Sequence, residues 1–247
     1  MNAVIPPLVF RSVSLVTLAL PVAVIGALTI FTAWAAERSD LSPRAREMVP
    51  VSVGGFLAVW LALGLILGDP ANFPLTDSNL RRLLSLVIGF GPVLIAAAPL
   101  AGSTTIRTLN AAMSPEWLVR VQIYRIAGFM FLYPLLYYGA IPTGFAVPAA
   151  VGDMLTGLLA PSVASAVRNR RRHAFAWAIV WNVFGIVDLI VAPTAAILSR
   201  AQVLALYPIS LVPLFIGPPL GILIHIWSLS NLRVAGRIEM ITTASQA

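Results

Sequence analysis

Five polar or charged residues lie inside otherwise apolar segments, and their types could move protons or hold an ion. Asp153 lies in "FAVPAAVGDMLTGLLAP" and Asp188 in "WNVFGIVDLIVAP", where Asn182 precedes it by about two helical turns. Arg125 lies in "VQIYRIAGFMFLY" and His225 in "GILIHIWSL". Because charges inside a membrane span are costly and tend to be functional, we take these five residues as the candidate ion, proton or ligand site.

The two carboxylates are expected at similar depth on consecutive antiparallel helices. Asp153 is about 8 residues, or ~12 Å, from the outer end of its span, and Asp188 is about 10 residues, or ~15 Å, from the outer end of the next. Either carboxyl could carry a proton, which predicts a proton or cation site. The alternative interpretation is that each carboxyl only accepts hydrogen bonds between helices and locks the bundle.

The other three residues allow several interpretations. Arg125, ~6 Å inside the cytoplasmic end of its span, could reach back to the headgroups, pair with an acid or hold an anionic head group. His225, ~9 Å from the cytoplasmic end, could bond between helices, relay protons, or ligate haem or a pigment. With Asn182 near the middle, the spacing predicts a broken polar axis if all five side chains face inward.

Composition indicates what surrounds these residues. Of the 247 residues 59% are hydrophobic and 10% charged, and the mean hydropathy is +0.92. A soluble domain carries roughly 25% charged residues, so the expected solvent is a lipid bilayer. Long apolar runs rather than short alternating segments favour helices over a barrel. The sequence therefore predicts an all-α integral membrane protein, with residues 1–247 forming a single polytopic membrane domain.

We expect about seven transmembrane helices. Their approximate ranges are 12–35, 49–67, 83–101, 121–140, 145–167, 174–198 and 213–232. The fourth helix should begin in water at Ser114-Pro115-Glu116, a cap, a first-turn proline and an acid. Residues 203–218 contain three prolines, with a fourth directly after them at Pro219, and predict a short interfacial or re-entrant piece before the last helix.

The arginines predict the orientation. All 16 basic residues are arginine, and four of them crowd the loop between the fifth and sixth spans, which marks that loop as cytoplasmic. Alternation then leaves only Arg11, Arg81, Arg82 and Arg200 outside. The N-terminus is expected outside and the C-terminus inside, in a bacterial inner membrane. Ala33-Trp34-Ala35 could end a signal peptide, but cleavage there would leave six spans, and the arginines would then no longer agree with this orientation.

Several chemistries are excluded or lack a motif. The chain has no cysteine and no lysine, which excludes thiol chemistry, disulfides and a lysine Schiff base. It contains no HExxH, GxSxG, Walker or GxGxxG motif, and with two histidines a classical zinc site is not expected. We assign no catalytic residue and no metal site, and the arginine excess fits cytoplasmic loops rather than nucleic-acid binding.

The back half of the chain, roughly residues 121–233, resembles a family of uncharacterised multi-pass bacterial membrane proteins. The matching pieces are "YRIAGFMFL", "GAIPTGFAVPAAVGDMLTGLLAP", "WNVFGIVDLIVAP" and "LVPLFIGPPLGILIHIWSL". The resemblance implies a shared membrane fold and brings no substrate, cofactor or residue role with it.

Two functions remain open from the sequence. The first is an inner-membrane protein with a polar intramembrane site, acting in transport or in proton- or ion-linked sensing. The second is an accessory subunit of a larger membrane complex, or a homo-oligomer, that binds haem, pigment, quinone or lipid through His225. The interrupted last span favours the first, because broken helices form the binding sites of many transporters.

Overall fold

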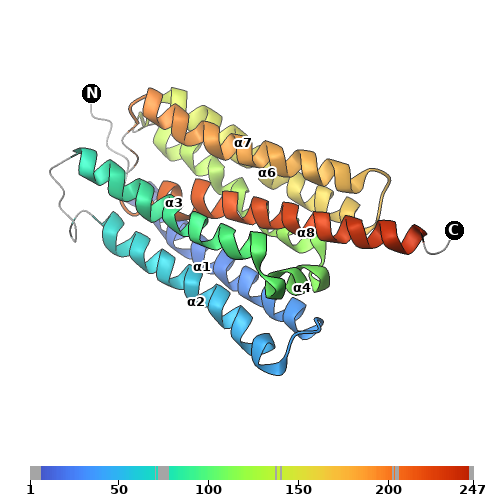
Figure 1. The fold of residues 1–247 in the computed structure, drawn as a ribbon. Helices are drawn as coiled ribbons and strands as arrows, with labels where there is room; N and C mark the ends of the chain where they lie inside the picture. The colour runs from blue at the N-terminus through green and yellow to red at the C-terminus, as the bar shows by residue number, and fades with distance from the viewer. Residues whose placement is uncertain are drawn as a thin grey trace.

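The computed structural model of the chain is a bundle of long helices (Figure 1). It describes residues 7–69, 71, 78–136, 138–139, 141–201, 203 and 206–244, and none of these forms a strand. The α-helices are α1 (Pro7–Glu37), α2 (Pro43–Gly68), α3 (Ser78–Gly102), α4 (Thr104–Ala112), α5 (Pro115–Val121), α6 (Thr143–Arg168), α7 (Ala174–Leu198) and α8 (Pro218–Ala244). A 3-10 helix, η1 (Gln122–Gly128), and two π-helices, η2 (Phe131–Leu136) and η4 (Val212–Ile216), complete the order.

The predicted fold class is confirmed at the level of an all-α chain with membrane-length apolar helices. Within the described residues α1, α2, α6, α7 and the stretch 214–235 are long and apolar enough to cross a bilayer. α3 and α4 raise the number from five to six if they count as one span, although they meet at a bend of 81°. The expected number of about seven is therefore not reached by length and composition alone.

The expected span 83–101 is counted only together with α4, and the fourth expected span, 121–140, is not counted at all. The helix begins at Pro115 as predicted, with Glu116 in its first turn, although the Ser114 side chain makes no capping hydrogen bond. After Val121 it tightens into the 3-10 helix η1 and then widens into the π-helix η2. Residues 137 and 140 of this predicted span lie outside the described residues.

The 3-10 conformation decides which side chains of η1 share a face. A 3-10 helix has three residues per turn, so residues three apart in the sequence stack above one another. Gln122, Arg125 and Gly128 are spaced in this way, and all three are buried. This tight segment therefore aims an amide and a guanidinium in one direction, toward the interior of the bundle.

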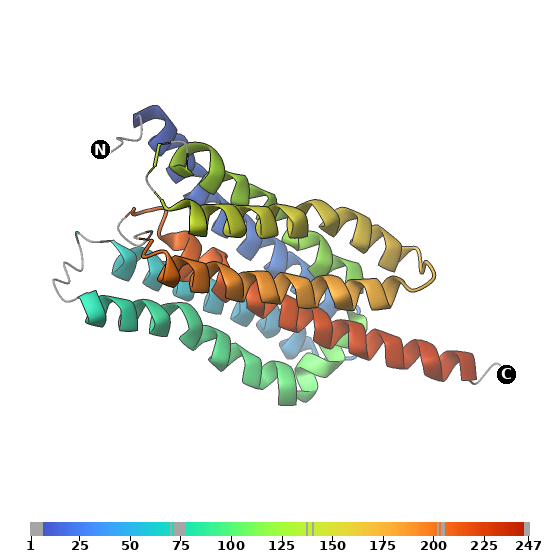
Figure 2. The same ribbon diagram turned by 90° about the horizontal axis from the view of Figure 1, so that it is seen from above.

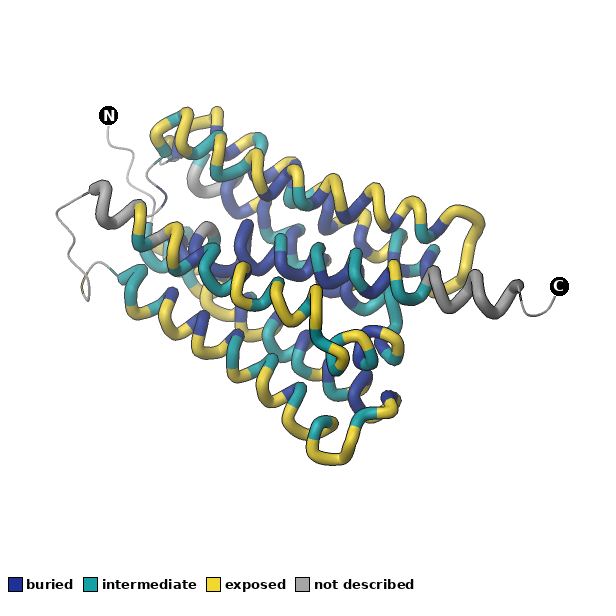
Figure 3. The backbone as a smooth tube through the Cα atoms, in the orientation of Figure 1, coloured by how far each residue is buried: buried dark blue, intermediate teal, exposed yellow. Residues whose placement is uncertain are grey.

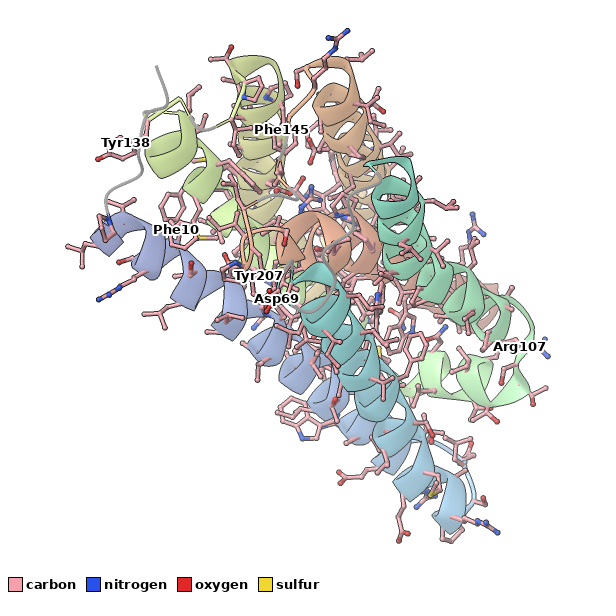
Figure 4. The ribbon with its side chains drawn as sticks, turned by 90° about the vertical axis from the view of Figure 1, so that its left-hand side faces the viewer. Phe10, Asp69, Arg107, Tyr138, Phe145 and Tyr207 are labelled. Carbon is pink, nitrogen blue, oxygen red and sulfur yellow. The ribbon has the colours of Figure 1, made fainter. Side chains whose placement is uncertain are left out.

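The segment before α8 is irregular, as its prolines predict. It includes the π-helix η4, and α8 begins at Pro218. Figure 4 shows Tyr207, in the segment before η4, beside Asp69 at the end of α2, with Arg107 on α4 lying apart. α8 begins at Pro218 and continues to Ala244 rather than ending near 232, so His225, seven residues after Pro218, lies near the beginning of a long helix.

α8 is the central helix. An 18-residue window of the stretch 214–235 is 78% buried inside the protein, against 22–39% for the corresponding windows of the other four span-length helices. Figure 1 shows α6 and α7 above α8 and α1 and α2 below it. In Figure 3 the buried residues follow α8, while exposed residues lie on the outer faces of the surrounding helices. These outer faces are apolar, with exposed side chains such as Leu158, Val187 and Ile190, as lipid contact requires.

Candidate functional site

The Arg125 side chain is the centre of a buried charged cluster. Its Nε donates to Asp153 Oδ1 at 2.7 Å, and its Nη2 donates to Asp188 Oδ2. The arginine side chain is 1% exposed, and the aspartate side chains are 15% and 9% exposed. One guanidinium on η1 thus joins a carboxylate on α6 to a carboxylate on α7. Its planar fork of donors is what makes two simultaneous ion pairs feasible.

The third guanidinium nitrogen extends the cluster to α8. Arg125 Nη1 donates to the Gly185 carbonyl at 3.4 Å and lies 3.1 Å from His225 Nε2. On the other side of the imidazole, Nδ1 lies 2.9 Å from Asn182 Oδ1. The five residues chosen from the sequence therefore form one connected cluster, which we call the Arg125 network.

The contacts define the protonation state of the imidazole. A guanidinium can only donate, so His225 Nε2 is the acceptor in its contact with Arg125. The proton of the neutral ring is then on Nδ1, which donates to Asn182 Oδ1. Asn182 is held in the matching orientation because its Nδ2 donates to the Ala178 carbonyl at 2.8 Å. Adding a proton at Nε2 would require the imidazole and the guanidinium to separate.

Glycines make room for these contacts. A Cβ at Gly152 would overlap the Asp188 carboxylate, and a Cβ at Gly185 would overlap the His225 ring. At Gly128 a Cβ would lie 2.5 Å from Asp153 Cβ. Each ionisable side chain that meets Arg125 thus lies against the bare backbone of a neighbouring helix, where only glycine fits.

The charges in the Arg125 network do not balance when both carboxylates are ionised. One positive charge then faces two negative charges. Only one oxygen of each carboxylate accepts from Arg125, and Asp153 Oδ2 and Asp188 Oδ1 have no hydrogen-bond partner among the described residues. A single proton or monovalent cation at either oxygen would make the cluster neutral. No group of three metal-ligating side chains occurs in the described part of the chain.

The structure distinguishes between the interpretations that the sequence left open for Arg125 and His225. The Arg125 guanidinium pairs with acids and does not reach back to the headgroups, because η1 turns its side chain inward and the side chain is long enough to contact both aspartates. Both ring nitrogens of His225 are engaged, so this arrangement leaves none for an axial bond to haem or a pigment. The predicted axis is continuous rather than broken, because each of the five side chains contacts another member of the set.

Further side chains support the network, and one of them, Gln122, was missed from the sequence. The Trp181 ring packs edge-on against His225 at 5.2 Å, and its Nε1 donates to the Thr156 carbonyl at 3.2 Å. Gln122 Nε2 donates to the Gly221 carbonyl at 3.4 Å, and Tyr124 Oη donates to the Ile216 carbonyl at 3.0 Å. These last two carbonyls flank the irregular start of α8. The i, i+3 spacing of Gln122 and Arg125 was a usable signal, because residues three apart share a face of an α-helix as well as of a 3-10 helix.

The fold and the Arg125 network together define a class: an all-α bundle of membrane-length apolar helices that encloses an Arg–Asp–Asp–His–Asn cluster. The chain belongs to the family described as "Domain of unknown function (DUF8737)", whose match covers residues 82–233. The match includes the whole Arg125 network and agrees with the resemblance seen over residues 121–233. No curated protein and no solved structure matches the chain.

Proposed function

We propose that this protein is a multi-pass membrane protein whose Arg125 network binds and releases a proton, in proton-linked transport or sensing. The observation that carries the proposal is the unequal pairing of one buried guanidinium with two carboxylates, each of which keeps one oxygen without a partner in the described part of the chain. Intramembrane charges that pair in this way mark ion pathways and proton relays in many membrane proteins.

The burial of the network favours a proton over a larger cargo. Arg125 is 2% exposed and His225 is 0% exposed, and glycine backbones pack directly against the carboxylates and the imidazole. A proton adds no volume, whereas a hydrated ion or an organic substrate would need the surrounding helices to separate. The His225–Asn182 pair adds a second group that can exchange a proton, provided that Arg125 moves away from Nε2.

The proposal includes the topology that the arginines predict. In it the chain crosses a bacterial inner membrane about seven times, with the segment α5–η1–η2 as the fourth crossing, the N-terminus outside and the C-terminus in the cytoplasm. Non-α backbone at membrane depth is tolerated where it is buried in protein, and the hydrogen bonds of Gln122 and Tyr124 to carbonyls next to α8 fit that requirement.

Infrared difference spectroscopy of the protein in lipid nanodiscs tests proton binding directly. We expect the carbonyl stretch of a protonated carboxylic acid to appear on acidification and to be changed or lost in Asp153→Asn and Asp188→Asn. Glu116→Gln, in the first turn of α5, is the control and should leave the difference band intact. A band that both aspartate variants leave unchanged would remove the basis of the proposal.

Proteoliposomes loaded with a pH-sensitive dye separate transport from sensing. For transport, an imposed pH gradient should collapse faster with the wild-type protein than with Asp153→Asn or Asp188→Asn. Equal flux in the wild type and both variants would exclude a role of these carboxylates in transport.

A further inference from the structure

Buried polar atoms without partners gather beside the Arg125 network. Among the described residues six buried side-chain atoms have no hydrogen-bond partner, and four of them belong to Gln122 (Oε1), Thr156 (Oγ1), Ser228 (Oγ) and Asn231 (Oδ1). These four residues are at most 1% exposed. Protein interiors leave few such atoms, and ordered water usually satisfies those that remain.

All four atoms are displaced from the network in the same direction. α6 and α8 run toward the end of the bundle that carries α4 and the C-terminus, whereas α5–η1 and α7 run the opposite way (Figures 1 and 2). Thr156 follows Asp153 on α6, and Ser228 and Asn231 follow His225 on α8. Gln122 precedes Arg125 on η1. Each is therefore shifted toward the α4 end.

Local hydrogen bonding does not explain the free hydroxyl groups. Elsewhere in the protein helical hydroxyl groups donate to the carbonyl four residues earlier, as those of Thr17, Thr32 and Ser199 do. Ser228 and Thr156 lie within long α-helices and make no such bond. Their hydroxyl groups instead remain free for a partner outside the helix backbone.

The orientation of Asn231 is fixed by α4. Its Nδ2 donates to the carbonyls of Asn110 at 2.8 Å and Met113 at 3.1 Å, near the end of that helix. The amide cannot turn over without losing both bonds, so Oδ1 stays on the other side of the amide, without a donor. Ser228 and Asn231 are three residues apart and are neighbours on the surface of α8.

A second polar cluster, around Asn110, extends this row of buried polar side chains to the surface. Asn110 accepts at Oδ1 from Trp227 Nε1 at 2.7 Å and donates from Nδ2 to Ser230 Oγ at 3.2 Å. Ser230 is half-buried and Arg233, almost one turn later, is exposed. Polar groups therefore run from His225 through Ser228 and Asn231 to the α4 end of the bundle.

We propose that ordered water fills the space between these side chains and forms a buried hydrated path along α8, from His225 to the surface beside α4. Water in the path would donate to Asn231 Oδ1 and Gln122 Oε1, and it would accept from or donate to the two hydroxyl groups. Its role as the proton's route between the Arg125 network and that surface rests on the proposed function; the presence of water does not.

Cysteine accessibility tests the path, because the chain contains no cysteine of its own. Ser228→Cys replaces a hydroxyl by a thiol of similar shape, and the probe is the water-soluble methanethiosulfonate ethylammonium. Ile224→Cys is the control for a dry position, since Ile224 is 1% exposed in the apolar core. Asn169→Cys, in the exposed α6–α7 turn, is the control for full access.

We expect Ser228→Cys to react at least roughly tenfold faster than Ile224→Cys, because thiol reaction needs water and a thiolate. Equal slow rates beside a reactive Asn169→Cys would overturn the proposal.

Radiolytic labelling gives a second test in the unmodified protein, which also applies if Ser228→Cys does not fold. X-ray-generated hydroxyl radicals formed from buried water oxidise the side chains next to that water. Trp227, beside the proposed path, is compared with Trp60; both rings are buried and both Nε1 atoms are hydrogen-bonded. We expect faster oxidation of Trp227, and equal rates would contradict the path. The infrared test of the carboxylates is independent, so failure of the path and failure of proton binding give different results.

Discussion

At the residue scale Arg125 joins more of the molecule than any other polar side chain of the network. Its three nitrogen atoms make contacts with a carboxylate on α6, a carboxylate and a carbonyl on α7, and an imidazole on α8. Lysine would offer one compact ammonium group in place of this planar fork. Removing only the arginine would leave two facing carboxylates without their counter-ion inside an apolar bundle.

Arg125→Met should therefore destabilise the protein by about 3–5 kcal/mol, as expected when one partner of a buried ion pair is lost. The triple variant Arg125→Met, Asp153→Asn, Asp188→Asn should lose less, since no unpaired charge remains. The free energy of unfolding in mixed micelles measures both, with Arg120→Met, an exposed position on α5, as the control. A single variant as stable as the wild type, or a triple variant no better than the single one, would contradict the charge argument.

At the scale of elements, η1 and the glycines of α6 and α7 determine how closely the helices meet. Gly157 lies against the backbone of Ile126, where a Cβ would be 2.5 Å from the amide nitrogen, and Gly152 lies against Asp188. The contact between α6 and η1 is thus a close approach of backbones. At the contact between α6 and α7, the Asp188 carboxylate packs against the backbone of Gly152.

Gly152→Ala should push Asp188 away from Arg125 and cost about 1–3 kcal/mol, the usual cost of overpacking. Gly26→Ala is the matched control on α1, because a Cβ there has no neighbour within 4 Å and alanine favours a helix. Thermal unfolding in nanodiscs should show a lower midpoint for Gly152→Ala only. If both variants unfold at the wild-type temperature, the close packing at Gly152 does not hold the carboxylate.

At the scale of the whole molecule, α8 separates two groups of helices. The larger apolar core joins residues of α1, α2 and α8, among them Leu28, Trp60 and Ile224. The Arg125 network lies on the other face of α8, against η1, α6 and α7. Because the α6–α7 turn lies at one end of the bundle, and the end of α2 and the start of α3 lie at the other, the two connections should face opposite sides of the membrane (Figure 1).

Single cysteines in the cysteine-free chain can test this topology. An impermeant maleimide added to intact cells should label Ala71→Cys, in the α2–α3 connection, and should not label Asn169→Cys, in the arginine-rich α6–α7 turn. Both should be labelled after the membrane is permeabilised. Labelling of Asn169→Cys in intact cells would reverse the orientation that the arginines predict.

The sequence by itself determined the class of the protein and the residues worth examining. Apolar composition and run length predict membrane-length helices, because a bilayer requires internally bonded backbone, and isolated charges within those runs are visible without a structure. Residues 153, 188, 125, 182 and 225 could be selected from the sequence in this way. The helix start at Pro115 was also predictable, since capping signals are local in the sequence.

Only the tertiary structure decided how these residues meet. Depths counted at one rise per residue left Arg125 and His225 in the half of the membrane opposite to the aspartates. The 3-10 helix η1, the reach of the guanidinium and the position of His225 near the start of α8 bring them together, and none of these follows from hydrophobic periodicity. The contacts of Gly152 and Gly185 depend on residues of α7 and α8 far away in the sequence, so packing in three dimensions, not local pattern, makes one network of five isolated residues.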